Sequence, residues 1–204
     1  FETSDGAVFL GRENGLYKSG DRGQSWKQVQ NGGWVMDIVE ADGVLIATGQ
    51  GGIIRSTDNG EHWESVINEG GVGIAVERID GGFAAISYNT TLKARRIHIA
   101  VDSGKTWQSL QSPRTVNLND CLLLSEDCFR AVGDSASWIG TSDGGNTWLF
   151  DQILDLVGDI YSFSFSPIAQ NFYVGIYGAD SLTIMTGNSN YCTDVINDVF
   201  TSGP

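Results

Sequence analysis

The sequence predicts an all-β protein, and three observations support this prediction. Glycine makes up 27 of 204 residues, which is about twice its average share in proteins, and glycine is common in tight turns. Short apolar segments of strand length lie between turns that are rich in aspartate and glycine. A motif recurs along the chain, and four short strands in each unit of about 40 residues are typical of a β-propeller blade.

The recurring motif has the form (Ser/Thr)-x-Asp-x-Gly-x-x-Trp. Three complete copies cover residues 19–26, 56–63 and 141–148, and a fourth copy at residues 100–107 lacks only the first hydroxyl. Their aspartates lie 37, 44 and 41 residues apart, at Asp21, Asp58, Asp102 and Asp143. Four matches at nearly constant spacing indicate a structural repeat.

The segments that flank the motif repeat as well. Residues 40–49 resemble residues 3–11, and residues 79–86 and 124–133 occupy the same place in their units. Each unit therefore contains two apolar strands joined by an Asp/Gly turn, a variable loop, a third strand, the motif and a fourth strand. We predict a single domain with repeat units at about residues 1–32, 33–70, 71–115, 116–156 and 157–204.

The fifth unit lacks a clear motif. Residues 160–165 and 171–177 resemble its first two strands, and residues 186–190 resemble a degenerate motif. The C-terminal segment 194–200 has a strand-like pattern, and we expect it to lie beside the N-terminus. We predict a closed ring of five blades, because an open ring leaves strand edges unpaired. The alternative is a fragment of a larger propeller.

The composition excludes several classes of partner. The chain has 12 Lys plus Arg and 25 Asp plus Glu, which gives a net charge of −13. Nucleic-acid binding needs a basic surface, so we expect no nucleic-acid partner. No run of 18 apolar residues occurs, so we expect no membrane insertion. The chain begins at Phe1 and not at methionine, which fits removal of an upstream segment, and we expect an exported protein, periplasmic or extracellular.

The three cysteines, Cys121, Cys128 and Cys192, leave the redox state open. The spacing of the first two matches no zinc motif, and with two histidines in the chain we predict no metal site. A Cys121–Cys128 disulfide across a hairpin is one alternative, and three small buried thiols are the other. Phosphate-binding and calcium-binding loops are absent from the sequence, so we expect no cofactor.

The motif resembles the Asp-box, or BNR repeat, and the resemblance extends by its period over nearly the whole chain. Residues 15–26 look most like proteins similar to the photosystem II stability/assembly factor. The resemblance implies a structural motif that closes the hairpin between the third and fourth strands of a blade. The chemistry agrees, because the carboxylate accepts turn N–H groups and the indole covers an edge of the blade. The residues expected to act in this way are Asp21, Gly23, Trp26, Asp58, Gly60, Trp63, Asp102, Gly104, Trp107, Asp143, Gly145 and Trp148.

We predict no catalytic residues. Residues 140–144 match the Gly-x-Ser-x-Gly nucleophile motif, but they lie inside a repeat motif and lack the strand-turn-helix context. His62 and His98 belong to no catalytic motif. Sialidases share the Asp-box, but the Arg-Ile-Pro segment that is usual in them is absent. Glycoside hydrolysis needs two carboxylates that face each other. Because the chain has 25 acidic residues, many pairs could meet this condition, and the number of acids does not indicate a glycosidase.

The loops on the face opposite the motifs are the expected binding surface, because loops on a rigid scaffold usually carry function. The most distinctive loop covers residues 88–96 and holds three of the 12 cations. It is either a contact for an anionic or carbohydrate partner or a solvated hairpin, and Asn89 also begins a glycosylation sequon. Trp34 either lines the mouth of the channel or packs inside. The candidate contact residues are Trp34, Tyr88, Asn89, Lys93, Arg95, Arg96 and Arg114.

We therefore predict a non-catalytic protein-binding or assembly module with a protein partner, as the resemblance to assembly-factor-like propellers implies. A carbohydrate-binding lectin is the first alternative, although the loops differ so much between units that repeated identical sugar pockets are not expected. A glycoside hydrolase or sialidase-like enzyme is the less favoured alternative.

Overall fold

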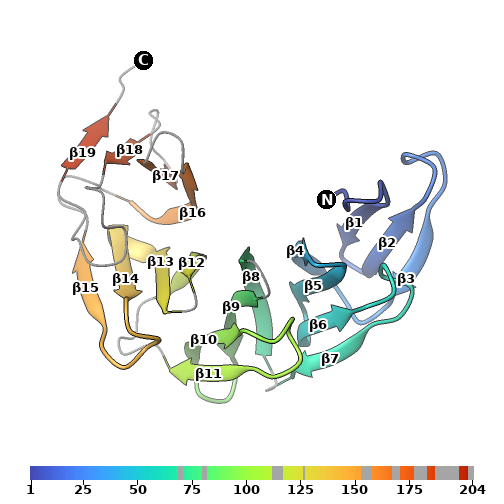
Figure 1. Ribbon diagram of the computed structural model, residues 1–204, viewed down its shortest axis with the longest axis horizontal. Helices are drawn as coiled ribbons and strands as arrows, with labels where there is room; N and C mark the ends of the chain where they lie inside the picture. Colours follow the sequence, from blue (N-terminus) through green and yellow to red (C-terminus); the bar gives the residue numbers. More distant parts are fainter. Residues whose placement is uncertain are drawn as a thin grey trace. The chain divides into compact units, whose positions relative to one another are not determined.

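The structure is a computed structural model, and it describes residues 1–68, 71–79, 82–111, 117–125, 127–152, 158–166, 171–176, 183–186 and 198–201. Its described residues form 19 strands in five antiparallel sheets, with one short 3-10 turn, η1 (Asp134–Ala136). In every sheet the strands follow one another in chain order (Figure 1). The all-β prediction is confirmed.

The chain divides into two compact units, Phe1–Gln111 and Ser112–Pro204. The first unit holds three sheets: β1 (Val8–Arg12), β2 (Gly15–Ser19) and β3 (Lys27–Gln30); β4 (Val35–Ala41), β5 (Val44–Gly49), β6 (Gly52–Ser56) and β7 (Glu64–Ile67); and β8 (Gly71–Ile79), β9 (Gly82–Asn89), β10 (Ala94–Ala100) and β11 (Gln108–Gln111). Beside β1, the N–H of Phe9 donates to the carbonyl oxygen of Phe1 at 2.8 Å, and Glu2 forms a bridge with Val8.

The second unit holds two four-stranded sheets: β12 (Leu118–Ser125), β13 (Cys128–Gly133), β14 (Ser137–Thr141) and β15 (Leu149–Gln152); and β16 (Ile160–Ser166), β17 (Asn171–Ile176), β18 (Thr183–Thr186) and β19 (Asp198–Thr201). The two expected strands of the fifth unit are present as β16 and β17. The C-terminal strand β19 pairs with β18, with Thr201 opposite Thr183. The described part of this segment therefore forms the fourth strand of the fifth sheet.

The cores of the first unit lie where neighbouring sheets face each other. Phe9 and Leu16 of the first sheet pack against Leu45 of the second. Ile46 of the second sheet packs with Val76 and other residues of the third. Strand β5 is buried along its whole length, which explains its continuous apolar pattern, Val44-Leu-Ile-Ala.

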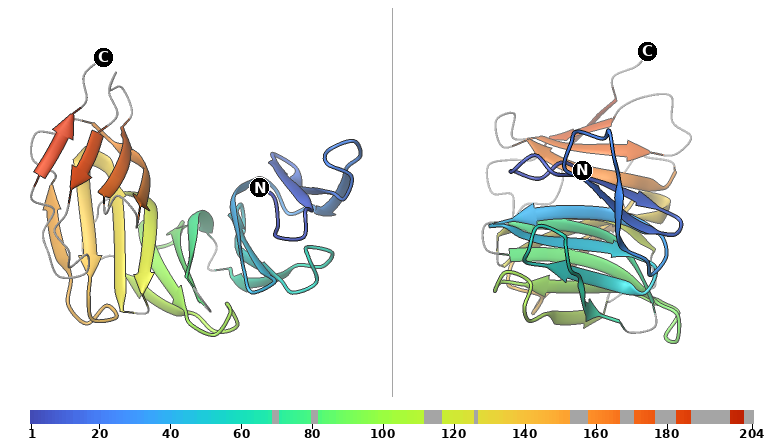
Figure 2. Two further views of the ribbon diagram at one scale, coloured as in Figure 1. Left: turned by 45° about the horizontal axis from the view of Figure 1, so that its top comes forward. Right: turned by 90° about the vertical axis from the view of Figure 1, so that its right-hand side faces the viewer.

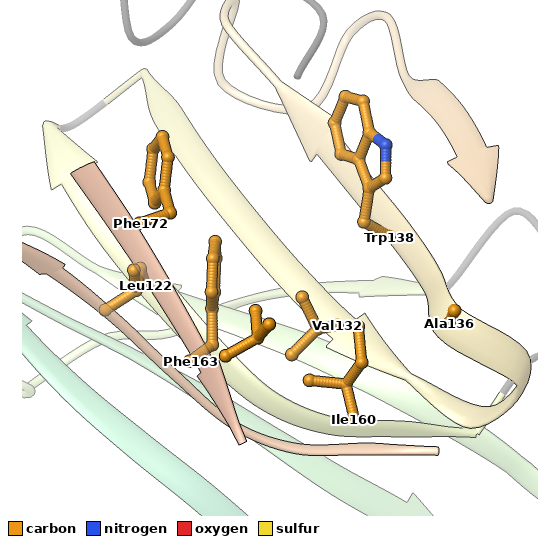
Figure 3. Close-up of a cluster of buried hydrophobic side chains, with 8 residues drawn as sticks. Leu122, Val132, Ala136, Trp138, Ile160, Phe163 and Phe172 are labelled. Carbon is orange, nitrogen blue, oxygen red and sulfur yellow. The ribbon is translucent and has the colours of Figure 1, made fainter. Parts of the chain in front are cut away.

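The second unit has one core between its two sheets, which lie face to face in Figure 2. Leu122 and Val132 of the fourth sheet pack with Ile160, Phe163 and Phe172 of the fifth (Figure 3). The Phe163 and Phe172 rings are stacked, with 5.2 Å between their centroids. The fifth sheet thus contributes to this core although its own repeat lacks a clear motif, because apolar strand faces drive the packing of sheets.

A β-bulge interrupts the first strand of each four-stranded sheet near its start. The register shifts between Val35 and Asp37 in β4, and the same irregularity recurs at the equivalent place in β8, β12 and β16. A bulge leaves one residue outside the ladder and redirects its side chain. The bulged residues are Met36, Ile74, Asn119 and Tyr161.

Candidate functional site

Each of the four motifs forms the turn between the last two strands of its sheet: β2 and β3, β6 and β7, β10 and β11, and β14 and β15. In the second motif, the hydroxyl of Ser56 donates to Asp58 Oδ1 at 2.8 Å, and the N–H of His62 donates to the same oxygen at 2.9 Å. The N–H of Gly60 donates to Ser56 Oγ at 2.9 Å. The indole N–H of Trp63 donates to the carbonyl oxygen of Gly60 at 3.0 Å. These contacts close the turn on itself.

The first and fourth motifs repeat these contacts, whereas the third has Ala100 in place of the first hydroxyl residue and shares the aspartate and tryptophan contacts. Their carboxylates accept the N–H four residues later, as in Asp21 from Ser25 (2.8 Å), Asp102 from Thr106 (2.9 Å) and Asp143 from Thr147 (2.8 Å). The Ser or Thr hydroxyl at that position donates to the second carboxylate oxygen. In the second motif the imidazole of His62 takes this place, with Nδ1 at 2.6 Å from Asp58 Oδ2.

These hydrogen bonds hold the motif carboxyls in the charged form. The hydroxyl of Ser25 is the largest cause that lowers the pKa of Asp21 to about 2. The hydroxyl of Thr147 has the same effect on Asp143, whose pKa is also about 2. The pKa values of the other two motif aspartates are lowered by contacts of the same kind. At neutral pH these groups accept hydrogen bonds and have no proton to donate.

The turn requires two consecutive residues with positive φ, which the sequence did not reveal. We expected the motif glycine to adopt this conformation, and Gly60 has φ +76°. The residue before it does so as well: φ is 58° at Arg22, 56° at Asn59, 57° at Ser103 and 65° at Gly144. The motif therefore tolerates a side chain at this place at the cost of some backbone strain.

In the first unit the motif also joins neighbouring sheets. A Cβ atom at Gly60 would lie 2.5 Å from the ring of Phe9 on β1, so only glycine fits there. The rings of Trp63 and Phe9 meet edge to face at 6.3 Å. The carboxylate of Glu61 forms ion pairs with two lysines of the first sheet, Lys18 at 2.7 Å and Lys27 at 2.9 Å. Hydrogen bonds from these lysines lower the pKa of Glu61 to about 2.

At the opposite ends of these sheets, backbone contacts bring three candidate residues into one row. Arg95 pairs with Tyr88, and Tyr88 pairs with Val72. Val72 forms a bridge with Gln50, whose N–H donates to the carbonyl oxygen of Trp34 at 2.9 Å. We call these five residues the Trp34–Arg95 row. It crosses the second and third sheets and lies within the first unit.

The exposed apolar part of this surface is at the start of β4. The side chain of Trp34 is 41% exposed, and that of Met36, two residues later, is 49% exposed. Gly33 precedes Trp34 with φ +108°, and a Cβ there would lie 2.4 Å from the Gln50 side chain. Close backbone packing thus holds the base of the loop while the indole reaches solvent, which decides between our two expectations for Trp34 in favour of exposure.

The hairpin between β9 and β10 is built from several of the other candidates. Asn89 is only 6% exposed, and its Oδ1 accepts the N–H groups of Thr91 and Leu92 at 3.0 and 2.8 Å, so it caps the turn. The guanidinium of Arg95 lies 5.6 Å from the centre of the Tyr88 ring. Lys93 is exposed and has φ +51°.

The remaining candidates are distributed differently. Arg96 is half-buried and lies next to Arg95 on β10, and Arg114 lies outside the described residues. His98 is fully buried in β10, where its ring nitrogens lie 2.7 Å from Ser87 Oγ and 2.8 Å from Ser109 Oγ. The two hydroxyls occupy both nitrogens inside the sheet.

Two half-buried aspartates that the sequence analysis did not identify connect successive sheets. The N–H of Val76 donates to Asp37 Oδ2 at 3.1 Å, and the N–H of Phe163 donates to Asp120 Oδ2 at 2.7 Å. Burial raises the pKa of Asp37. Each aspartate follows the bulge of a first strand. The parallel segments Val35-Met-Asp-Ile and Leu118-Asn-Asp-Cys were the signal in the sequence.

The cysteines are not equivalent. Cys121 is a buried thiol that is not part of a disulfide, whereas Cys128 is disulfide-bonded. The alternative of a Cys121–Cys128 bridge is therefore wrong, and so is that of three free thiols. Cys192 lies outside the described residues. Adjacent strands place Cys121 opposite Ala131, and not opposite Cys128.

The described residues contain neither a group of potential metal ligands nor a helix that could span a membrane. There, three or more His, Cys, Asp or Glu side chains do not come together as metal ligands. In that same part of the chain, a helix with the length and apolar character to cross a membrane is absent.

Comparison with known proteins places the chain by its fold. No protein-family model and no curated protein matches it. The structure of YCF48 bound to D1 peptide is 11% identical, with a TM-score of 0.58 over 76% of this chain and 50% of that chain. An ancestral GH74 enzyme is 14% identical, with a TM-score of 0.72 over 96% of this chain and 29% of that one. A nidogen/laminin complex is 13% identical, with a TM-score of 0.65 over 91% of this chain and 73% of that one.

The chain spans no more than half of the length of the first two of these structures. The sequence identities to these three structures are 11%, 14% and 13%. Similarity at this level shows a shared architecture. It does not show a shared function, because one fold hosts many functions. Together with the five antiparallel sheets of repeated design, these similarities lead to one conclusion: the chain has the β-propeller fold.

Proposed function

We propose that the chain is a non-catalytic, protein-binding β-propeller module, and that its partner contacts the Trp34–Arg95 row and the adjoining Met36. The observation that carries this proposal is the exposure of both Trp34 and Met36, two residues apart at the start of β4. Trp and Met are enriched at the cores of protein interfaces, where a few large side chains supply most of the binding energy. Structures of the same fold include YCF48 with a bound D1 peptide and a nidogen/laminin complex.

We also propose that the four motifs are Asp-boxes with a structural role. Their carboxylates accept hydrogen bonds from their own turns. The glycines of the second and third motifs lie against side chains of the preceding sheet. In the first unit, the motifs lie at the sheet ends opposite the Trp34–Arg95 row. The scaffold and the proposed contact surface therefore use different residues, and substitutions can separate them.

The protein-binding proposal is tested by comparing two exposed tryptophans. Trp26, in the first motif, is 40% exposed, nearly the same as Trp34, but lies at the motif end of its sheet. We expect extracts of the source organism to yield a partner with the wild-type chain and with Trp26→Ala, and to lose it with Trp34→Ala. Melting temperatures of all three chains serve as the folding control. Equal capture by both variants would refute the assignment of the surface.

A carbohydrate-binding function is the second candidate, and one observation in the second unit favours it. Tyr161 is 57% exposed at the bulge of β16. Next to it, Asn119 donates to Asp134 Oδ1 and to the carbonyl oxygen of Ile160, both at 3.0 Å. An exposed aromatic ring beside amide and carboxylate groups suits a sugar ring. A glycan array and a panel of glycoside substrates separate the two: sugar binding that Tyr161→Ala abolishes supports a lectin, and turnover supports an enzyme.

A further inference from the structure

We propose that the Trp34–Arg95 row binds an extended peptide segment in which acidic side chains flank an apolar one. This inference rests on the proposed protein-binding function and goes further by assigning the chemistry of the partner. It combines an apolar anchor, a distribution of charge between the two ends of the sheets, and the length of the row.

The apolar anchor is the pair Trp34 and Met36. Their exposed side chains flank Val35, which packs into the core of the first unit, so the backbone between them is fixed. The bulge at Met36 takes this residue out of the ladder, and its side chain is 49% exposed. A fixed indole and a flexible thioether accept an aliphatic or aromatic side chain with little loss of their own freedom.

Charge is divided between the two ends of the sheets in the first unit. The described connections at the end of the row hold the cations Arg12, Lys93 and Arg95, with Arg96 following, and their acidic residue is Glu13. The motif end carries the acids Asp5, Asp21, Asp42, Asp58, Glu61 and Asp102, and these outnumber the cations there, which are Lys18, Arg22, Lys27 and Lys105. In a chain of net charge −13, the row therefore lies at the end of this unit where an acidic segment meets cations.

The cations differ in what they offer a partner. Arg12 and Lys93 are exposed, whereas Arg95 and Arg96 are half-buried. The guanidinium groups of Arg12 and Arg95 each lie over a tyrosine ring, Tyr17 and Tyr88, so exposure is what distinguishes Arg12 from Arg95. We therefore assign the charge contacts to Arg12 and Lys93. Arg95 positions the Tyr88 ring, and the capped Asn89 turn holds Lys93 in place.

The length of the row sets the length of the segment. Four successive pairings separate Arg95 from Trp34, which is roughly 20 Å at about 4.8 Å for each pairing. An extended chain advances about 3.3 Å per residue, so about six residues span the row. The apolar side chain meets the Trp34 end, and acidic side chains on both sides reach Arg12 and Lys93.

The test uses three synthetic octapeptides with the same central Leu-Phe pair and flanks of Glu, Gln or Lys. Binding is followed by NMR through the indole N–H signals of the chain, which has six tryptophans. Trp34→Phe identifies the signal of Trp34. We expect the Glu peptide to shift this signal and to bind at least about five-fold more tightly than the Gln peptide at low salt, with the difference lost at high salt. The Lys peptide is expected to bind weakest.

A matched pair of double variants isolates the charges. Arg12→Gln with Lys93→Gln should reduce binding of the Glu peptide to the level of the Gln peptide. Arg22→Gln with Lys105→Gln changes the net charge equally, but its residues are exposed at the motif end, and we expect binding as in the wild type. Circular dichroism confirms that both variants are folded.

Each contrary result has a distinct meaning. Equal binding of the Glu and Gln peptides, or preference for the Lys peptide, overturns the acidic segment while the contact at Trp34 stands. Binding of none of the peptides overturns the inference, and the Trp34→Ala capture experiment then decides the proposed function separately. A Trp34 shift with a glucan oligosaccharide in place of the peptides overturns it in favour of a sugar ligand.

Discussion

At the scale of single residues, the motif aspartate acts as an acceptor for its own turn. Asp58 receives the Ser56 hydroxyl and the N–H of His62. We expect Asp58→Ala to lower the melting temperature by several degrees, because these donors lose their partner. Peptide binding at Trp34 should be unchanged after correction for the folded fraction. Glu13→Ala, an exposed acid outside the motifs, is the control. Full thermal stability of Asp58→Ala would contradict the structural role.

The glycines of two motifs separate backbone strain from packing. Gly60 (φ +76°) and Gly23 (φ +85°) both require positive φ, but a Cβ meets the Phe9 ring at 2.5 Å in Gly60 and the nearest atom at 3.5 Å in Gly23. Gly23→Ala should cost about 1 kcal/mol of unfolding free energy from strain alone. Gly60→Ala should cost about 1–3 kcal/mol more from overpacking. Urea unfolding of both variants measures the difference, and equal losses would show that the Phe9 contact is unimportant.

The motif carboxyls also predict how stability depends on pH. Asp21 and Asp143 have pKa values of about 2 in the folded chain, against about 3.9 in an unfolded chain. Their contribution is therefore complete above about pH 4 and is lost as the pH falls toward about 2. Urea unfolding at stepped pH should show this loss, and Asp21→Asn with Asp143→Asn should make the acid limb shallower. An unchanged acid limb in the double variant would contradict the assignment.

At the scale of secondary-structure elements, the β9–β10 hairpin combines an exposed tip with an ordered base. Lys93 is exposed, whereas Arg95 is half-buried beside the Tyr88 ring. We expect Lys93→Gln to leave the melting temperature within error and Arg95→Gln to lower it, because the latter loses packing as well as charge. Thermal scans of the two single variants check this. The reverse order would show that the tip, and not the base, stabilises the hairpin.

The first strand of each four-stranded sheet contains a β-bulge that the sequence did not predict. The motif between two strands was readable because its contacts span at most four residues, as between Asp58 and His62. The bulges could not be predicted from the sequence, because a bulge is defined by how one strand pairs with the next. Asp37 accepts a hydrogen bond from Val76, 39 residues further along the chain, and the similarity of its segment to that of Asp120 did not indicate which sheet the carboxylate reaches.

At the scale of the whole molecule, the cysteines give a prediction about redox state. Cys128 is disulfide-bonded and Cys121 is a buried thiol that is not part of a disulfide. Alkylation in denaturant without reductant should label Cys121 and leave Cys128 unlabelled, and prior reduction should expose both. Mass spectrometry of the digested chain reads the result. Labelling of Cys128 without reduction would contradict the disulfide.

The sequence by itself determined the all-β class, the period of the repeat and the turn at each motif. These features depend on contacts between residues close in the chain, such as the indole of Trp63 and the carbonyl of Gly60. Tertiary structure alone decided which candidates are exposed. Trp34 and Asn89 were equal candidates, yet one is 41% and the other 6% exposed. The reason is physical: the exposure of a side chain depends on which distant strands and turns pack beside it, as Gln50 does beside Gly33, and local patterns do not encode that pairing.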